Sequence, residues 1–209
     1  MTRVAVFIDY QNAYRGARSA FNLDSAEFVE GQFFPGRLGL HVVQEGRSLD
    51  PERQLVSVAV YRGEPSSLFS PKGLAACQRQ ARLWSTQPLV TPVTRPLKYY
   101  GQYTDVDGRR RYTDVREKGI DVLIALGIVM GAMRDEYDVA VLMSADSDLL
   151  PALETARELG KRVEVAAWRS RSWSSQLRLP GMWCHNLDES WYRRLHDPTD
   201  YTQPILGET

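Results

Sequence analysis

The chain has 209 residues, of which 43% are hydrophobic, and this size and composition fit one α/β domain with a sizeable core. The formal net charge is zero, so no global basic field indicates a nucleic-acid partner, although a local basic patch would suffice to bind one. The two cysteines, Cys77 and Cys184, are far apart and outside any CxxC pair, which argues against structural zinc and a disulfide framework. No apolar run approaches the ~20 residues that a membrane-spanning helix needs.

In the first half of the chain, apolar runs alternate with segments of helical character. We expect strands at residues 4–8, 55–61 and 89–100, the last at a sheet edge because of its prolines, and helices at residues 12–21 and 70–84. Residues 22–53 are punctuated by glycine and proline, so we interpret them as an insertion or a long loop.

The second half opens with a turn signal. Asp107-Gly108 between two short alternating runs predicts a β-hairpin over residues 102–115. We then expect helices at residues 119–134, 147–159 and 188–195, and strands at residues 137–143, 162–168 and 182–187. The helix at 119–134 is apolar nearly all round, which predicts a buried helix.

This alternation predicts an α/β fold with an open, mostly parallel sheet, helices on both faces and an inserted β-hairpin. We expect a single domain over residues 1–196 and a flexible tail over residues 197–209, because the tail is polar and contains proline. The first residues lead into a strand rather than a signal peptide, so we expect a reduced, cytoplasmic protein.

Four aspartates occupy places where an unpaired carboxylate is costly. Asp9 follows the first apolar run, Asp146 and Asp148 follow another, and Asp121 opens the apolar helix. A lone ionised carboxylate beside a core costs several kcal/mol unless it is paired, capped or bound to a cation. Taken singly, such an aspartate is more often a helix N-cap. Together, at the carboxyl ends of parallel strands and at the start of a helix, the four predict a site for Mg²⁺ or Mn²⁺ and hydrolysis of phosphate esters.

Three blocks carry a resemblance to a known family. They are Val-Phe-Ile-Asp-Tyr-Gln-Asn at 6–12, Glu-Lys-Gly-Ile-Asp-Val at 117–122, and a third block from Tyr137 to Val163 that includes Leu-Met-Ser-Ala-Asp-Ser-Asp at 142–148. In these blocks the chain resembles a NYN domain of the PIN-like nuclease superfamily, in its LabA-like branch. The chain departs from the family pattern at Gly127, where relatives often have another aspartate, and at Ala145, where they often have glycine.

The resemblance implies a PIN-like (Rossmannoid) fold and metal-dependent cleavage of RNA. By resemblance, Asp9, Asp121, Asp146 and Asp148 would hold Mg²⁺ or Mn²⁺ and act in catalysis, and Asn12 would position a ligand or water. Further candidates for contact with single-stranded RNA are polar, basic or aromatic residues near strand ends and the hairpin turn: Ser144, Arg109, Arg110, Arg111, Trp168, Arg169 and Arg171. For each of these a structural role is an open alternative: a turn hydroxyl for Ser144, a solvated hairpin tip for the three arginines, and a core position for Trp168.

The leading interpretation is therefore a metal-dependent ribonuclease, with RNA as partner, no membrane, and a homodimer left open. The alternative is a non-catalytic RNA- or protein-binding module that keeps the fold, which the glycine at 127 and the zero net charge favour. A phosphatase of another α/β family ranks low, because Asp9-Tyr10-Gln11 lacks the expected Asp-x-Asp. Neither GxxxxGK[ST] nor GxGxxG is present, which disfavours nucleotide-dependent enzymes.

Overall fold

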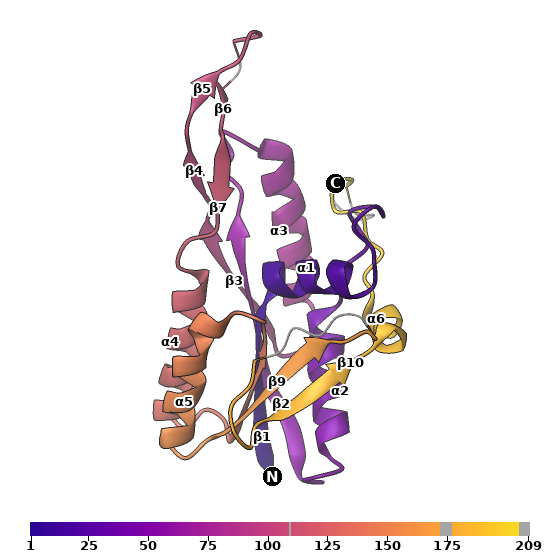
Figure 1. The fold of residues 1–209 in the computed structure, drawn as a ribbon, viewed down its shortest axis with the longest axis vertical. Coiled ribbons are helices and arrows are strands. Elements are labelled where there is room, and N and C mark those ends of the chain that lie inside the picture. Colours follow the sequence, from indigo (N-terminus) through magenta and orange to yellow (C-terminus); the bar gives the residue numbers. More distant parts are fainter. Residues whose placement is uncertain (109, 172–176, 205–209) are drawn as a thin grey trace.

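The computed structural model describes residues 1–108, 110–171 and 177–204, and its centre is a twisted parallel sheet (Figure 1). Within these residues the sheet has six strands in the order β10-β9-β8-β1-β2-β3. Their bounds are β1 (Thr2–Asp9), β2 (Arg53–Glu64), β3 (Val90–Pro96), β8 (Val139–Met143), β9 (Arg162–Trp168) and β10 (Trp183–Leu187). Every pairing in this sheet is parallel, so all carboxyl ends lie along one edge. The predicted α/β fold with a mostly parallel sheet is confirmed.

Helices cover both faces of the sheet and divide the apolar side chains into two cores. One face carries α1 (Tyr10–Ala20), α2 (Pro35–Gly46), α3 (Pro71–Ser85) and α6 (Glu189–Leu195), and the other carries α4 (Ile120–Met133), the 3-10 turn η1 (Ser147–Leu149) and α5 (Leu150–Glu158). Strand β1 serves both cores: Val4, Val6 and Ile8 point to the first, and Ala5 and Phe7 to the second. This period of two is what a strand buried on both faces requires.

A long antiparallel arm, residues 98–116, projects from the sheet beyond β3 (Figure 1). It consists of β4 (Lys98–Tyr100) paired with β7 (Asp114–Arg116), and β5 (Tyr103–Thr104) paired with β6 (Arg110–Arg111). The turn passes through Gly108 at φ +73°, so the predicted hairpin is confirmed. At the base of the arm, Phe69, Tyr99 and Tyr112 pack with ring centroids 4.4 to 4.8 Å apart, which fixes the arm to the domain.

The segment from 22 to 53 is not simply a loop, because it contains helix α2. Its glycines allow close packing rather than breaking the helix. A Cβ on Gly39 would lie 2.6 Å from a methyl group of Val58 on β2, and a Cβ on Gly46 would collide with the guanidinium of Arg53. Glycine at these positions lets α2 lie directly on the sheet.

Two further expectations are corrected. The start of the expected flexible tail is packed: Asp197 and Tyr201 are buried, the Tyr201 hydroxyl donates to Asp197 (2.5 Å), and Gln32 Nε2 donates to the Thr199 carbonyl (3.1 Å). Helix α4 is not buried all round. Because only one side of it meets the sheet, an outer apolar stripe is exposed, formed by Val122, Leu126, Met130 and Met133.

A charged network is buried beneath α2. Arg53 donates two hydrogen bonds to Glu164 (2.9 and 2.5 Å), and His185 lies between Glu164 (3.0 Å) and Glu45 (2.7 Å). Burial opposes the charged imidazole, but the hydrogen bonds to Glu164 and Glu45 raise the pKa of His185. Arg53, Glu164 and His185 are almost fully buried, so removing one partner would leave the others uncompensated.

We therefore expect Glu164→Gln to lower the free energy of unfolding by about 3 kcal/mol, because Arg53 would lose its buried counter-charge. Chemical denaturation followed by circular dichroism measures the change. Glu158→Gln, at an exposed glutamate of α5, is the matched control and should change stability little. Equal stability of the two variants would contradict the role given to this network.

Candidate active site

The crevice between the carboxyl ends of β1 and β8 is the point where the strand order reverses. From β1 the chain adds β2 and β3 on one side, then returns to place β8 and β9 on the other. In open parallel sheets, ligands bind in the crevice at such a reversal. Asp9 is the last residue of β1, and Asp146 lies three residues after the end of β8.

Asp9 and Asp146 are connected by hydrogen bonds through Ser144. The Ser144 hydroxyl donates to Asp9 Oδ2 (3.2 Å), and the backbone N–H of Asp146 donates to the Ser144 oxygen (3.1 Å). Asp9 also caps α1, because its Oδ1 accepts from the N–H of Asn12 (3.1 Å). Two predicted site residues, separated by most of the chain, are thus brought together.

Asn12 ties the same two segments together from the other side. Its Oδ1 accepts from the backbone N–H of Ala145 (2.9 Å), which fixes the loop that carries Asp146. Asn12 was predicted to position a ligand or water. In the structure, its side-chain oxygen positions the loop that presents the acid.

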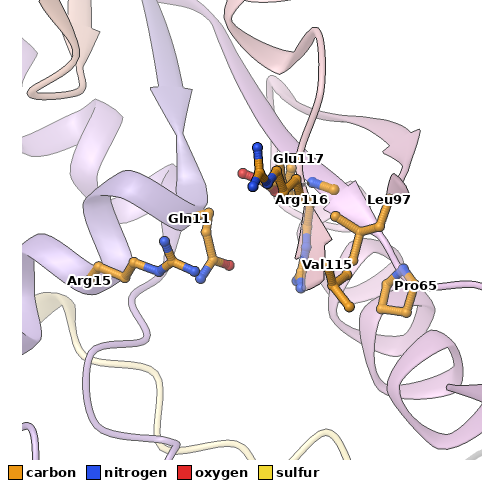
Figure 2. A pocket seen from close by; sticks show the side chains of 9 residues that line it. Gln11, Arg15, Pro65, Leu97, Val115, Arg116 and Glu117 are labelled. Atoms are coloured by element: carbon orange, nitrogen blue, oxygen red, sulfur yellow. Dashed lines mark hydrogen bonds between the residues drawn. The ribbon is translucent and has the colours of Figure 1, made fainter. Parts of the chain in front are cut away.

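Around these residues lies a cleft of about 370 Å³, here called the acidic cleft. Its lining is Asp9, Gln11, Asn12, Arg15, Gly16, Ser19, Glu117, Ala145 and Asp146. It shares Gln11, Arg15 and Glu117 with a neighbouring pocket of about 580 Å³, here called the basic pocket, whose other lining residues are Arg62, Gly63, Pro65, Leu97, Val115 and Arg116. Figure 2 shows the basic pocket, with Gln11 and Arg15 on one wall facing Leu97, Val115 and Glu117 on the other.

Glu117 is an acid of the cleft that sequence analysis missed. It follows β7 at the base of the arm, and its Oε1 accepts a short hydrogen bond from the N–H of Gly63 near the end of β2. The arm therefore delivers a third carboxylate to the edge where Asp9 and Asp146 lie. The one signal in the sequence for Glu117 is its place in the block at 117–122, which resembles the family. No apolar run precedes it, so the argument that identified Asp9 and Asp146 does not apply to it.

Asp9 is held in a state that resists ionisation. Burial raises the pKa of its carboxyl group to about 6, against the hydrogen bonds from Asn12 and Ser144, and the charges of Glu117 and Asp146 add to the rise. A cation placed among these acids would reverse this shift. The possible metal ligands in the lining are oxygen atoms of carboxylates, amides and a hydroxyl, which suit Mg²⁺ or Mn²⁺, and Arg15 adds a cationic side chain to the lining.

Comparison with family models matches residues 3–179 to the NYN domain. The chain belongs to the NYN domain family. The match is to the family as a whole, and the LabA-like branch stays a prediction. Among solved structures, the chain is similar to a protein of unknown function from Vibrio parahaemolyticus, with 19% identity over 90% of this chain and 94% of the other and a TM-score of 0.56. This similarity supports the fold alone. Comparison with curated proteins gave no match.

NYN domains belong to the PIN-like nucleases, which act on RNA and typically use divalent metals. In the described parts of this NYN domain, no helix is long and apolar enough to cross a membrane. Nor do three or more acidic, histidine or cysteine side chains of those parts converge in a metal-holding cluster. The side chains of Asp9, Asp146 and Glu117 thus surround a cleft without closing on a common centre.

The other two predicted acids of the NYN domain do not line the acidic cleft. Asp121 is exposed in the first turn of α4, and Asp148 is exposed in η1, where its N–H donates to Asp146 Oδ1 (3.0 Å). The acid missing at Gly127 has a physical explanation. A Cβ there would collide with the hydroxyl of Tyr61, so this buried tyrosine occupies the room that an aspartate would need.

The predicted substrate contacts divide into surface and core residues. Trp168 does not offer a stacking surface, which corrects that prediction: it is 2% exposed, its indole N–H donates to the Ala13 carbonyl (2.8 Å), and Phe21 packs against its ring. Arg169 and Arg171 are exposed just beyond β9.

Two of the three predicted hairpin arginines, Arg110 and Arg111, lie on the outer part of the arm. Arg110 is exposed, Arg111 is exposed and pairs with Asp105 (2.8 Å), and Arg109 lies outside the described residues. Arg110 and Arg111 form β6 in the hairpin of the arm, and neither of them lines the acidic cleft.

Asp9 should weaken the fold when it is ionised. Its pKa in the folded state, about 6, lies above its ordinary value of 3.8, so the stability present below pH 3.8 is lost as the pH rises through 6. We expect Asp9→Asn to raise the free energy of unfolding at pH 7.5 in EDTA, by up to about 3 kcal/mol. The asparagine oxygen can still cap α1.

Denaturation of both proteins at pH 7.5 and at pH 4 measures this effect. The gain should shrink toward zero at the lower pH, because wild-type Asp9 is then protonated. A variant that is less stable than wild type at pH 7.5 would show that Asp9 is not a strained acid.

Proposed function

We propose that this protein is a metal-dependent ribonuclease that hydrolyses RNA phosphodiester bonds in the acidic cleft. The observation that carries the proposal is the buried Asp9, joined through Ser144 to Asp146 and facing Glu117, at the strand-order reversal of a NYN domain. Such an arrangement costs stability and is retained where a bound cation would relieve it.

Mg²⁺ or Mn²⁺ is the cation that this site would hold. Mg²⁺ keeps several waters and is often bound by one or two carboxylates together with substrate phosphates, so it does not need a preformed cage of acids. Asp9 and Asp146 would be its principal protein ligands, with Glu117 next to them. When bound, the ion would lower the pKa of a coordinated water and neutralise charge that develops on the phosphate.

The chain's own residues position these parts. Asp9 is fixed by the N–H of Asn12 in α1, Asn12 and Ser144 hold the loop of Asp146, and the arm holds Glu117 against β2. The family resemblance places Asp121 and Asp148 in the site, but neither lines the cleft. They would act on the metal from outside the cleft rather than as its principal ligands. Arg110 and Arg111 on the arm, with Arg109 next to them in the sequence, and Arg169 and Arg171 beyond β9 would contact the RNA strand on either side of the cleft.

The second candidate is a module that binds RNA or a protein without cleavage. For both candidates we propose a cytoplasmic location. The absence of a three-acid cluster within the described residues and the Tyr61 hydroxyl beside Gly127 favour it. Calorimetry with Mn²⁺ separates the two candidates. Heat of binding at near-millimolar Mn²⁺ supports the nuclease, and no metal binding alongside tight RNA binding supports the module.

Asp146→Asn tests the proposed chemistry directly. The amide keeps the hydrogen bond to the N–H of Asp148 but removes the charge, so Mn²⁺-dependent cleavage of single-stranded RNA should fall roughly 100-fold or more. A gel assay with labelled RNA measures the rate. The control is Asp24→Asn, at an exposed aspartate outside the cleft. Full activity in a folded Asp146→Asn protein would remove this acid from the mechanism.

Glu117→Gln tests the acid that only the structure identifies. Its amide oxygen can still accept from the Gly63 N–H, so the arm should stay in place while the cleft loses one charge. We expect a higher Mn²⁺ concentration for half-maximal cleavage, by about tenfold. Asp148→Asn, which alters an exposed acid, should shift it less. The reverse order would place Asp148, and not Glu117, at the metal.

A further inference from the structure

The basic pocket beside the acidic cleft contains two arginines without acidic partners. Among the described residues, neither Arg62 nor Arg15 forms an ion pair, and the Nε of Arg62 is buried without a hydrogen bond. The third cation, Arg116, pairs with Asp114. The pocket is therefore lined by three arginines and a single carboxylate, Glu117, which is already engaged with the backbone of Gly63.

Arg62 is held in place before any ligand arrives. Its Nη1 donates a short hydrogen bond to Gln80, and the guanidinium lies 5.5 Å from the ring centroid of Tyr10 and 5.7 Å from that of Trp84. Gln80 is itself fixed, because its Nε2 donates to the Tyr10 hydroxyl and to Gln32 (both 2.9 Å). A cation that is positioned by buried residues loses little entropy when it binds an anion.

We infer that the basic pocket binds a phosphate group of the nucleic-acid strand, with Arg62 as its anchor and Arg15 as a second donor. A guanidinium matches phosphate with two parallel N–H donors, and a half-buried arginine without a carboxylate gains most from an anion. This assignment rests on the proposed function, since the phosphate belongs to the strand whose neighbouring phosphate lies in the acidic cleft.

The shape of the two cavities favours a strand over a lone anion. They share Gln11, Arg15 and Glu117, so the cavity beside Asp146 and the cavity beside Arg62 adjoin each other along these three residues. Pro65, Leu97 and Val115 provide an apolar wall in the basic pocket, against which a sugar or base can pack (Figure 2). A phosphate at Arg62 would hold the strand in register, with the next bond over the acids.

The test is binding of single-stranded RNA in EDTA, where cleavage is absent, followed by fluorescence anisotropy of a 3′ label. Arg62→Gln and Arg15→Gln should each weaken binding about tenfold. Each should also make the slope of the log of the association constant against log salt concentration less negative by about 0.7, as expected when one phosphate contact of a single strand is lost. Arg134→Gln, at the far end of α4, is the matched control and should change neither quantity.

Arg15 is exposed on α1, so its substitution should leave the fold intact even if Arg62→Gln lowers stability. Arg62→Lys keeps the positive charge and should recover part of the affinity that Arg62→Gln loses. RNAs with a 5′-phosphate and a 5′-hydroxyl show which phosphate is bound. If the glutamine variants lose the same affinity for both RNAs, the bound phosphate is internal. If they lose affinity only for the RNA with a 5′-phosphate, the bound phosphate is the terminal one. Wild-type affinity and salt slope in both glutamine variants would overturn the inference.

This binding experiment and the Mn²⁺ cleavage assay together separate this inference from the proposed function. If wild-type protein binds RNA through Arg62 and Arg15 but does not cleave it with Mn²⁺, the nuclease proposal fails and the phosphate site stands. If cleavage depends on Asp146 but binding is unchanged in both arginine variants, the nuclease proposal stands and the phosphate site fails.

Discussion

The candidate site is built on one hydrogen-bonded link, from Asp9 through the Ser144 hydroxyl to the backbone of Asp146. It joins the carboxyl ends of the adjacent strands β1 and β8, which are separated by most of the chain. The link exists because the two strands are parallel neighbours at the strand-order reversal, and because Asn12 fixes the same loop from α1. Everything that the cleft can do follows from holding two carboxylates at this edge.

Holding them there opposes stability. Burial keeps Asp9 reluctant to ionise, and Glu117, delivered by the arm, adds a further negative charge. The two apolar cores and the buried network of Arg53, Glu164 and His185 supply the stability that the site lacks. This division is typical of functional sites, where unfavourable electrostatics persist because the surrounding structure is stable. The basic pocket next to the cleft carries the opposite charge, so one strand can meet both.

The sequence predicted those features that depend on local pattern and strand order. Asp9 and Asp146 follow buried apolar runs, and the rule for parallel sheets brought them together. The sequence did not identify Glu117 as a site residue, because its position depends on how the arm packs against β2, and hydrophobic periodicity carries no information about that packing. Trp168 was assigned to RNA because its neighbours are cationic, yet it ends a strand that is buried from Val163 onward. The glycines of α2 were interpreted as breakers, since close approach to β2 is a tertiary constraint.

The most direct test of the central claim is a crystal structure of the protein in millimolar Mn²⁺, with the metal located by its anomalous scattering. We predict a peak within about 2.5 Å of carboxylate oxygens of both Asp9 and Asp146, on the side that faces Glu117. A cleft without any peak, or a peak bound only by exposed acids such as Asp148, would contradict the claim that these carboxylates share a cation.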